Sequence, residues 1–370
     1  MERITRRDFL KKSGQAALGT FGGLELIAGC ATMETPKPED IAASLASIKP
    51  EQVVYPKLPG QKIQPPENGC LVGLRKLYAT FPGNDRAKLT AYIDYCEEHL
   101  GRLPYTGVLY EGSSLARNFP VMASELFYKR GMKLYIVAKT FKDIGPMKQE
   151  FQFELKDIVS GRHDKLLGNY AEGAVQAGEK YGGFFITTME ESNGNWYYWG
   201  QTPQFIPAWR HIWEIFEHKG ANRYATWVWE CYPPETTIWA NNPETYYPGD
   251  QYVDWIGFSA FARQIYPDTM VPFKALVNNT FNQMRKKHPQ KPIMQAEFAH
   301  TNNPLQHKWI IDTYKTIKSM PAMKAAVFYD NVTPEGFFTD RRSDDDHTLN
   351  KEGFQAMKEI FKDPYWIMAK

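Results

Sequence analysis

Eight short apolar segments, separated by amphipathic ones, constrain the fold of this chain more than any other feature. Each apolar segment is rich in branched or aromatic residues, which is typical of a buried strand, and the stretches between them have helical periodicity. Alternation of this kind predicts βα units around a parallel sheet. The expected strands are Leu71–Leu74, Thr106–Tyr110, Lys133–Ala138, Phe184–Met189, Ala225–Trp229, Trp255–Ser259, Ile293–Ala296 and Ala325–Tyr329.

Helix-like segments lie between these strands and after the last one. They are Arg86–Glu98, Leu115–Arg130, Gly168–Lys180, Pro207–His218, Met270–Lys287, Pro304–Ser319 and Lys351–Phe361. Eight strands alternating with helices over about 300 residues predict an α/β fold of the (β/α)₈ TIM-barrel type. We expect one catalytic domain over residues 67–370, with no second domain and no internal repeat.

The N-terminus carries a targeting pattern. Residues 5–11 read Thr-Arg-Arg-Asp-Phe-Leu-Lys, a twin-arginine export motif, and the Gly/Ala-rich segment that follows is too short and too polar to span a membrane durably. Residues 26–30, Leu-Ile-Ala-Gly-Cys, resemble a lipobox in which Cys30 becomes the lipid-modified first residue. The alternative is an ordinary buried N-terminal helix.

This pattern predicts a signal peptide at residues 1–29 and export by the twin-arginine route. The mature protein is then expected to be lipid-anchored at Cys30 in the cell envelope, in the periplasm or at the outer membrane. Residues 30–66 are rich in Pro, Lys, Glu, Ser and Gln, with little periodicity. This composition predicts a flexible tether between the lipid and the domain.

Charge excludes one class of partner. Of 44 basic side chains five lie within residues 1–29, and of 42 acidic ones three do, so the rest of the chain is balanced. A basic stripe for a phosphate backbone is not visible, so no nucleic-acid partner is expected. A neutral surface suits an uncharged or weakly charged substrate.

The four cysteines do not have the spacing of metal ligands. Besides Cys30 they are Cys70, Cys96 and Cys231. A single Cys70–Cys96 disulfide in an oxidising compartment and three buried free thiols both remain open.

Catalytic side chains of a barrel lie at the C-terminal ends of its strands. The fourth expected strand ends in Glu190 and Glu191, followed by a polar turn and four aromatic residues. A carboxylate beside a wall of rings is typical of a site that cleaves sugars, because the acid must reach the glycosidic oxygen while rings stack on the sugar. The alternative is a solvated acidic pair next to packed aromatic side chains.

A second carboxylate, Glu297, follows the seventh expected strand. Cleavage of a glycosidic bond with retention needs two carboxylates about 5–5.5 Å apart, and strands four and seven face each other across a barrel mouth. The alternative is that Glu297 is a structural acid paired with a basic loop residue. No strand end carries a metal-ligand cluster or a phosphate-binding glycine loop, so we expect neither a metal nor a cofactor.

Two segments resemble a known family. Residues 191–199 read Glu-Ser-Asn-Gly-Asn-Trp-Tyr-Tyr-Trp and resemble the acid/base motif of glycoside hydrolase family 26, Glu-x-Asn-Gly-x-Trp-x-x-Trp. Residues 291–298, Lys-Pro-Ile-Met-Gln-Ala-Glu-Phe, resemble the nucleophile strand of that family, and segments 227–229 and 246–257 resemble its fifth and sixth strands. The resemblance covers about residues 66–365. It implies a retaining endo-glycanase on a (β/α)₈ barrel, and the family consists chiefly of β-mannanases.

Carried over by position, the resemblance implies that Glu191 is the acid/base, that Glu297 is the nucleophile and that Trp196 lines the site. A packed core indole is the alternative for Trp196, and Glu190 could point into the mouth in place of Glu191. Further substrate contacts are expected from strand ends, with core packing as the alternative for the aromatic ones; these residues are Glu190, Trp199, Trp229, Phe261 and Tyr329.

The chain departs from the family pattern around the two catalytic positions. Glu190 stands in place of a histidine, Thr187 of an arginine, and Phe261 of a tyrosine that touches the nucleophile. The sequence therefore predicts a retaining endo-β-glycosidase acting on a polysaccharide, either a β-mannan, as a mannan endo-1,4-β-mannosidase would, or an exopolysaccharide. The alternative is a non-catalytic polysaccharide-binding lipoprotein with a degenerate hydrolase cleft.

Overall fold

A computed structural model describes residues 36–50, 52–76, 85–111, 115, 118–143, 149–151, 154–237, 239–262, 270–332 and 346–370. At 110, 111, 141–143 and 149–151 it describes the backbone alone. The expected signal peptide and Cys30 lie outside these residues.

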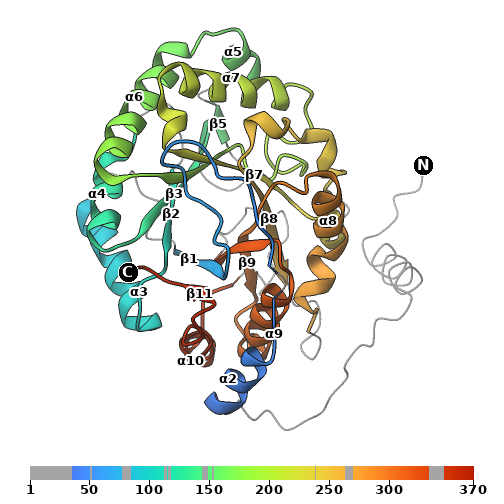
Figure 1. Cartoon of the computed structure of the whole chain (residues 1–370). Coiled ribbons are helices and arrows are strands. Elements are labelled where there is room, and N and C mark those ends of the chain that lie inside the picture. The colour runs from blue at the N-terminus through green and yellow to red at the C-terminus, as the bar shows by residue number, and fades with distance from the viewer. Residues whose placement is uncertain are drawn as a thin grey trace, which may run out of the picture.

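Eight parallel strands close into a barrel surrounded by helices, as the sequence predicts (Figure 1). Strand β1 pairs with both β2 and β10, for example Leu71 with Ala325, so the sheet has no open edge between its first and last barrel strands. Every expected strand is present, with ends within a few residues of the expected ones. The barrel strands are β1 (Cys70–Lys76), β2 (Thr106–Glu111), β3 (Lys133–Ala138), β6 (Phe184–Thr188), β7 (Ala225–Cys231), β8 (Trp255–Ala262), β9 (Ile293–His300) and β10 (Met323–Asp330).

The seven expected helices are also found, with shifted ends. They are α3 (Arg86–Leu100), α4 (Val121–Lys129), α6 (Asp164–Tyr181), α7 (Phe205–His218), α8 (Phe273–Lys287), α9 (Gln306–Ser319) and α10 (Lys351–Ile360). The largest shift is at α4, expected from Leu115, because Pro120 precedes its first turn and a proline disfavours helical geometry in the residue before it. None of the described helices is both long and apolar enough to cross a membrane.

Further short elements decorate the barrel. Strands β4 (Phe141–Asp143) and β5 (Gln149–Phe151) form an antiparallel hairpin after β3, and α5 (Leu155–Val159) follows it. Strand β11 (Trp366–Ile367) adds to β1 near the chain end.

Side chains alternate between the inside and the outside of the barrel. The interior cluster includes Tyr135, Phe185, Val228 and Met294. The second, larger cluster lies between the strands and the helices, where Trp227 and Trp229 pack. Because neighbouring residues of a strand point to opposite faces, this alternation decides which strand-end side chains reach the mouth.

The expectation of a flexible tether over residues 30–66 is wrong for its described part. Residues Pro38–Ala46 form helix α2, which buries Ile41 and Leu45, and Lys318 donates to the Leu45 carbonyl (2.8 Å). Residues 52–66 cross one end of the barrel, and Ile63 joins its interior cluster (Figure 1). The amide of Ile63 donates to the Thr226 hydroxyl at the start of β7 (2.8 Å).

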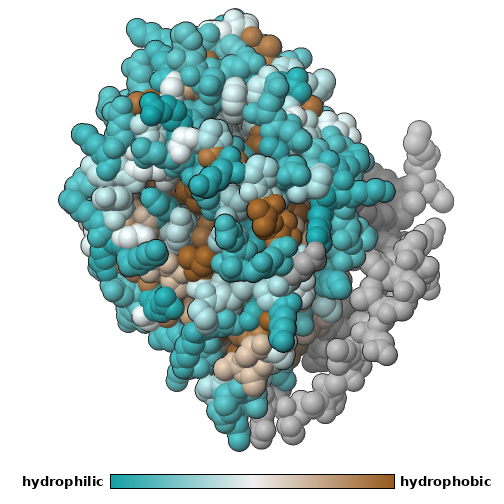
Figure 2. Space-filling view, viewed as in Figure 1, coloured by the Kyte–Doolittle hydropathy of each residue, from teal (hydrophilic) through white to brown (hydrophobic). Residues whose placement is uncertain are grey.

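An ion pair fixes this segment to the barrel. The Lys62 ammonium lies 2.9 and 2.8 Å from the two carboxylate oxygens of Asp254, and both side chains are buried. Proline-rich composition does not exclude such packing, because a few apolar and paired residues are enough to hold an irregular segment. The face seen in Figure 1 is largely hydrophilic, with small scattered apolar areas (Figure 2).

Cys70, Cys96 and Cys231 are buried free thiols, so no disulfide joins Cys70 and Cys96. Burial raises the pKa of Cys96 to about 12. Of the two states left open by the sequence, the described residues therefore adopt the reduced one.

Candidate active site

The loop after β6 holds Glu191 in an uncommon backbone geometry. Met189 and Glu191 both have positive φ, 54° and 52°, a region that costs a residue with a side chain about 1–3 kcal/mol. Glu191 is 7% exposed and Glu190 is 2% exposed. Backbone strain of this kind persists only where surrounding contacts enforce it.

Asn193 supplies several of those contacts. Its amide nitrogen donates to the carbonyls of Tyr232 (2.7 Å) and Asn241 (2.8 Å), and its amide oxygen accepts from the Tyr232 amide (2.8 Å). The side chain thus ties the loop after β6 to the loop after β7. Gly194 follows it because a Cβ there would lie 2.3 Å from the Trp196 ring.

The Glu191 carboxylate lies in a setting that favours its protonated form. The Trp196 indole donates to it at 2.5 Å. Burial, together with the nearby charges of Glu297 and Glu190, raises the pKa of Glu191 to about 8, whereas Trp196 and the Ser259 hydroxyl act in the opposite direction. This is the setting that a general acid needs at neutral pH.

A β-bulge turns Glu297 toward the mouth. Phe258 of β8 pairs with Gln295, but the next residue, Ser259, pairs with Glu297, so β9 has one extra residue here. Gln295 spans the bulge, because its amide nitrogen donates to the carbonyls of Phe258 and Glu297, both at 2.9 Å. Inside-outside alternation shifts at this point: Ala296 lies in the barrel interior and Phe298 in the outer core.

Arg75, at the end of β1, contacts Glu297 directly. Its guanidinium donates to the Glu297 carboxylate and lies 4.6 Å from the centre of the Tyr329 ring. The pKa of Glu297 is raised above its usual range by burial and by the charge of Glu190, although Arg75 and Lys139 oppose the shift. Phe261 packs edge-on against Tyr329, with ring centres 5.2 Å apart. An arginine therefore contacts the carboxylate, whereas Phe261, which stands in place of the family's tyrosine, has no hydroxyl to do so.

Two further glutamates share the barrel mouth. Glu190 lies 3.6 Å from the Lys139 ammonium, just after β3. Glu230, on β7, accepts a hydrogen bond from the Tyr135 hydroxyl. Burial raises the pKa of Glu230 well above its usual range, and the charge of Glu297 adds to the effect. The site therefore combines four buried carboxylates with two buried cations.

The structure brings most of the predicted residues together and separates two of them. Glu190, Glu191, Trp196 and Glu297 interact at the mouth, and Phe261 and Tyr329 adjoin them through Arg75. Glu190 and Glu191 therefore both belong to the site, although they are consecutive residues.

Trp199 and Trp229 do not belong to this group. Both are fully buried in the outer core, where Trp199 stacks on Tyr197 and Trp229 packs against Tyr247. Trp229 alternates with the inward-facing Glu230, so strand geometry turns it away from the mouth. The prediction that these two residues contact sugar is therefore wrong. The Trp199 indole instead donates to the Glu190 carbonyl (2.8 Å), which supports the strained loop.

Sequence reasoning missed Arg75, Lys139 and Tyr135. Each lies on or directly after an expected strand, and a cation at a strand end is the signal that could have identified Arg75 and Lys139. Tyr135 gives no such signal, because it lies within an apolar run.

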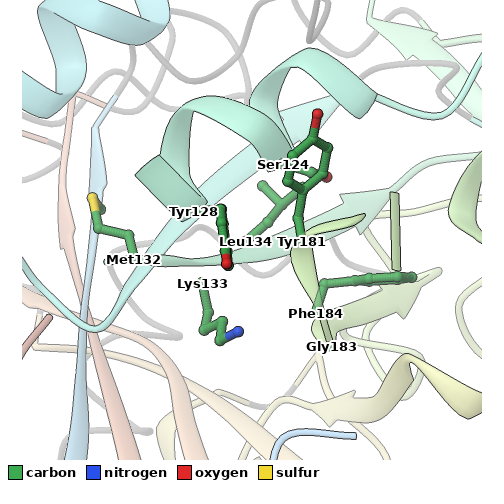
Figure 3. A pocket seen from close by; sticks show the side chains of 9 residues that line it. Ser124, Tyr128, Met132, Lys133, Leu134, Tyr181, Gly183 and Phe184 are labelled. Atoms are coloured by element: carbon green, nitrogen blue, oxygen red, sulfur yellow. The ribbon is translucent and has the colours of Figure 1, made fainter. Parts of the chain in front are cut away.

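No group of His, Cys, Asp or Glu among the described residues could hold a metal ion. A small surface pocket lies at the other end of the barrel, where Lys133 begins β3 and Phe184 begins β6 (Figure 3). Tyr128 and Tyr181 also line it, and none of the four glutamates does. The four glutamates therefore lie away from this pocket, toward the C-terminal ends of the strands.

Solved structures share this fold. GH26A from Muricauda sp. MAR_2010_75 is similar with a TM-score of 0.52 and 15% identity, over 93% of this chain and 98% of that one. A β-mannanase from a symbiotic protist of the termite Reticulitermes speratus, complexed with gluco-manno-oligosaccharide, is similar with a TM-score of 0.56 and 14% identity, over 82% of this chain and 89% of that one. The GH26 β-mannanase BoMan26A from Bacteroides ovatus has a TM-score of 0.56 and 14% identity, over 90% of this chain and 96% of that one.

None of the curated proteins compared with this chain matches it. A sequence model of glycosyl hydrolase family 26 matches residues 183–368, half of the chain, and this segment contains both Glu191 and Glu297. Together with the barrel, this match establishes that the chain belongs to glycosyl hydrolase family 26 and thus to the glycoside hydrolases.

Proposed function

We propose that this protein is a retaining endo-β-glycosidase that cleaves a polysaccharide by double displacement, with Glu191 as acid/base and Glu297 as nucleophile. The contrast between the surroundings of the two carboxylates carries the proposal. Burial and like charge raise the pKa of Glu191 to about 8. The pKa of Glu297 is raised as well, but only Glu297 has a cation, Arg75, in contact with it. Surroundings that differ in this way assign Glu191 as the acid and Glu297 as the anion.

In the first step, ionised Glu297 attacks the anomeric carbon while Glu191 gives its proton to the departing glycosidic oxygen. Arg75 favours the ionised form of Glu297, and Trp196 orients the Glu191 carboxyl through its indole hydrogen bond. In the second step, Glu191 takes a proton from water, which attacks the glycosyl–enzyme ester and releases Glu297.

The anomeric form of the first product tests this mechanism. Proton NMR recorded during the first minutes of hydrolysis of a β-linked polysaccharide is expected to show the β-anomer before mutarotation. Initial release of the α-anomer would indicate inversion and would contradict the role of Glu297 as a nucleophile.

The pH profile is expected to have an alkaline limb near pH 8. The acid form of Glu191 is required, and it is lost as pH rises through its pKa of about 8. Replacing Glu190 by glutamine removes a negative charge that raises this pKa, so the limb should move to lower pH in kcat/KM measurements. An unmoved limb would show that another group controls it. Glu179→Gln, on the exposed face of α6, is the matched control.

The family and the altered surroundings of the site support a proposal for the substrate class. We propose a β-mannan or a bacterial exopolysaccharide, and two of the similar structures described above are named as β-mannanases. The loss of the tyrosine hydroxyl at Phe261 and the extra carboxylate of Glu190 favour a substrate that differs from plain mannan.

We also propose that the chain is exported by the twin-arginine route and anchored by a lipid on Cys30. The support is the order of motifs at residues 5–11 and 26–30. Expressed in a bacterium with this export route, the protein should partition with membranes, and Cys30→Ala should move most of it to the soluble fraction. Equal partitioning of the two proteins would contradict the anchor.

A further inference from the structure

Trp239 differs from every other tryptophan of the chain. It is 58% exposed, whereas the other nine, all of which the structure describes, are buried or half-buried. A single exposed apolar side chain is common on protein surfaces and needs no explanation by itself. Its position relative to Glu191 is what suggests a function for it.

The segment that carries Trp239 is joined to the loop that carries Glu191. Ala240 forms a β-bridge with Gly194, and the Asn241 amide donates to the Asn193 carbonyl (2.9 Å). The Gln201 side chain donates to the carbonyls of both Trp239 (2.9 Å) and Asn193 (3.0 Å). These bonds fix the backbone on which the exposed indole stands, so little ordering would be needed for it to bind a ligand.

The acid/base side of a retaining site is the side from which the leaving group departs. The acid/base must contact the glycosidic oxygen, and sugars beyond that oxygen therefore lie next to the residues around it. Residues 193 and 194, bonded to the Trp239 segment, follow Glu191 by two and three positions. An indole offers a flat apolar face to the C–H face of a sugar ring.

We propose that Trp239 is a stacking platform for a sugar ring of the polysaccharide on the leaving-group side of the site. This inference rests on the proposed function and adds a binding subsite to it. The bond from Gln201 is accepted by the backbone carbonyl of Trp239, and the other bonds noted above do not involve Trp239, so the Trp239→Ala variant keeps the bonds that hold the loop.

The test compares the full chain, Trp239→Ala and the control Tyr128→Ala. Tyr128 is an exposed aromatic residue (52%) on α4, away from the loops after β6 and β7. Each protein is assayed on β-mannan and mixed-linkage glucan, and on 4-nitrophenyl glycosides of the same oligosaccharides, which have no sugar on the leaving-group side.

For Trp239→Ala we expect KM to rise about tenfold on the polysaccharide that the wild type cleaves, with unchanged kinetics on the nitrophenyl glycoside. Tyr128→Ala should match the wild type on both. Unchanged KM on the polysaccharide, or an equal loss on both substrates, would overturn the inference and leave the proposed function intact.

If the wild type cleaves none of these substrates, the same proteins are compared by affinity electrophoresis in gels containing each polysaccharide. Retardation that Trp239→Ala alone loses would support the platform, although the proposed hydrolysis would have failed. Equal retardation of all three proteins, or no retardation of the wild type, would overturn the inference.

Discussion

Replacing Glu297 by alanine is expected to lower hydrolysis of the polysaccharide substrate by about 10⁴-fold or more, because the covalent intermediate can no longer form. The fold should survive, since the mutation removes a buried carboxylate whose burial is unfavourable, although it leaves Arg75 without this contact. Unfolding curves of the variant and the wild type would check that activity, and not folding, is lost.

Replacing Glu191 by alanine is expected to affect two kinds of substrate differently. Glu191→Ala should reduce polysaccharide hydrolysis by about 10²–10⁴-fold, the usual contribution of a general acid. It should affect the first step far less on a nitrophenyl glycoside, because that leaving group departs without a proton. Glu179→Ala, an exposed substitution on α6, should match the wild type on both substrates. Equal losses on both substrates in Glu191→Ala would contradict its role as acid.

Lys62→Met is expected to lower the free energy of unfolding by about 3–5 kcal/mol, because it leaves the buried Asp254 carboxylate without its cation. Asp254 also accepts a hydrogen bond from the Trp227 amide at 2.8 Å, so its displacement would disturb the start of β7. Urea unfolding of the two proteins measures the difference, with the exposed Lys57→Met as control.

A double variant separates the ion pair from the packing of the segment. Lys62→Met combined with Asp254→Leu should recover part of the lost stability, because no uncompensated charge then remains. A loss below about 1 kcal/mol in Lys62→Met, the range of an exposed pair, would mean that residues 52–66 are not integral to the folded domain.

Periodicity made the barrel predictable, because each of its strands is a local apolar run and each helix a local amphipathic one. The N-terminal segment was not predictable in this way. Ile63 and Lys62 are stabilised by partners on β7 and before β8, more than 150 residues away, and local composition carries no trace of those contacts.

The candidate site likewise has residues that local sequence predicts and contacts that it does not. Glu191 and Glu297 lie within contiguous motifs, so their positions could be read directly. The Arg75–Glu297 contact joins residues that are 222 positions apart, and it forms only when β1 and β9 come together across β10. The errors at Trp199 and Trp229 arose because aromatic residues near a strand end face either the mouth or the outer core, and alternation decides between them.

The β-bulge at Glu297 shows why the sequence alone could not predict which residues of this strand point into the barrel. Regular alternation through Met294 and Ala296 would turn Phe298 inward and Glu297 outward. One extra residue, spanned by the Gln295 amide, reverses this order. Its signal in the sequence is the polar Gln295 within the expected strand Ile293–Ala296, whose other residues are apolar.

Product release by the purified protein tests the central claim most directly. Wild type and Glu297→Ala would be incubated with β-mannans, mixed-linkage glucans, β-xylans and bacterial exopolysaccharides, and soluble oligosaccharides would be quantified. We predict that the wild type releases oligosaccharides from one class of polysaccharide and that Glu297→Ala releases none. Equal release by both proteins, or binding of a polysaccharide by both without release, would contradict the assignment of Glu191 and Glu297 as a catalytic pair.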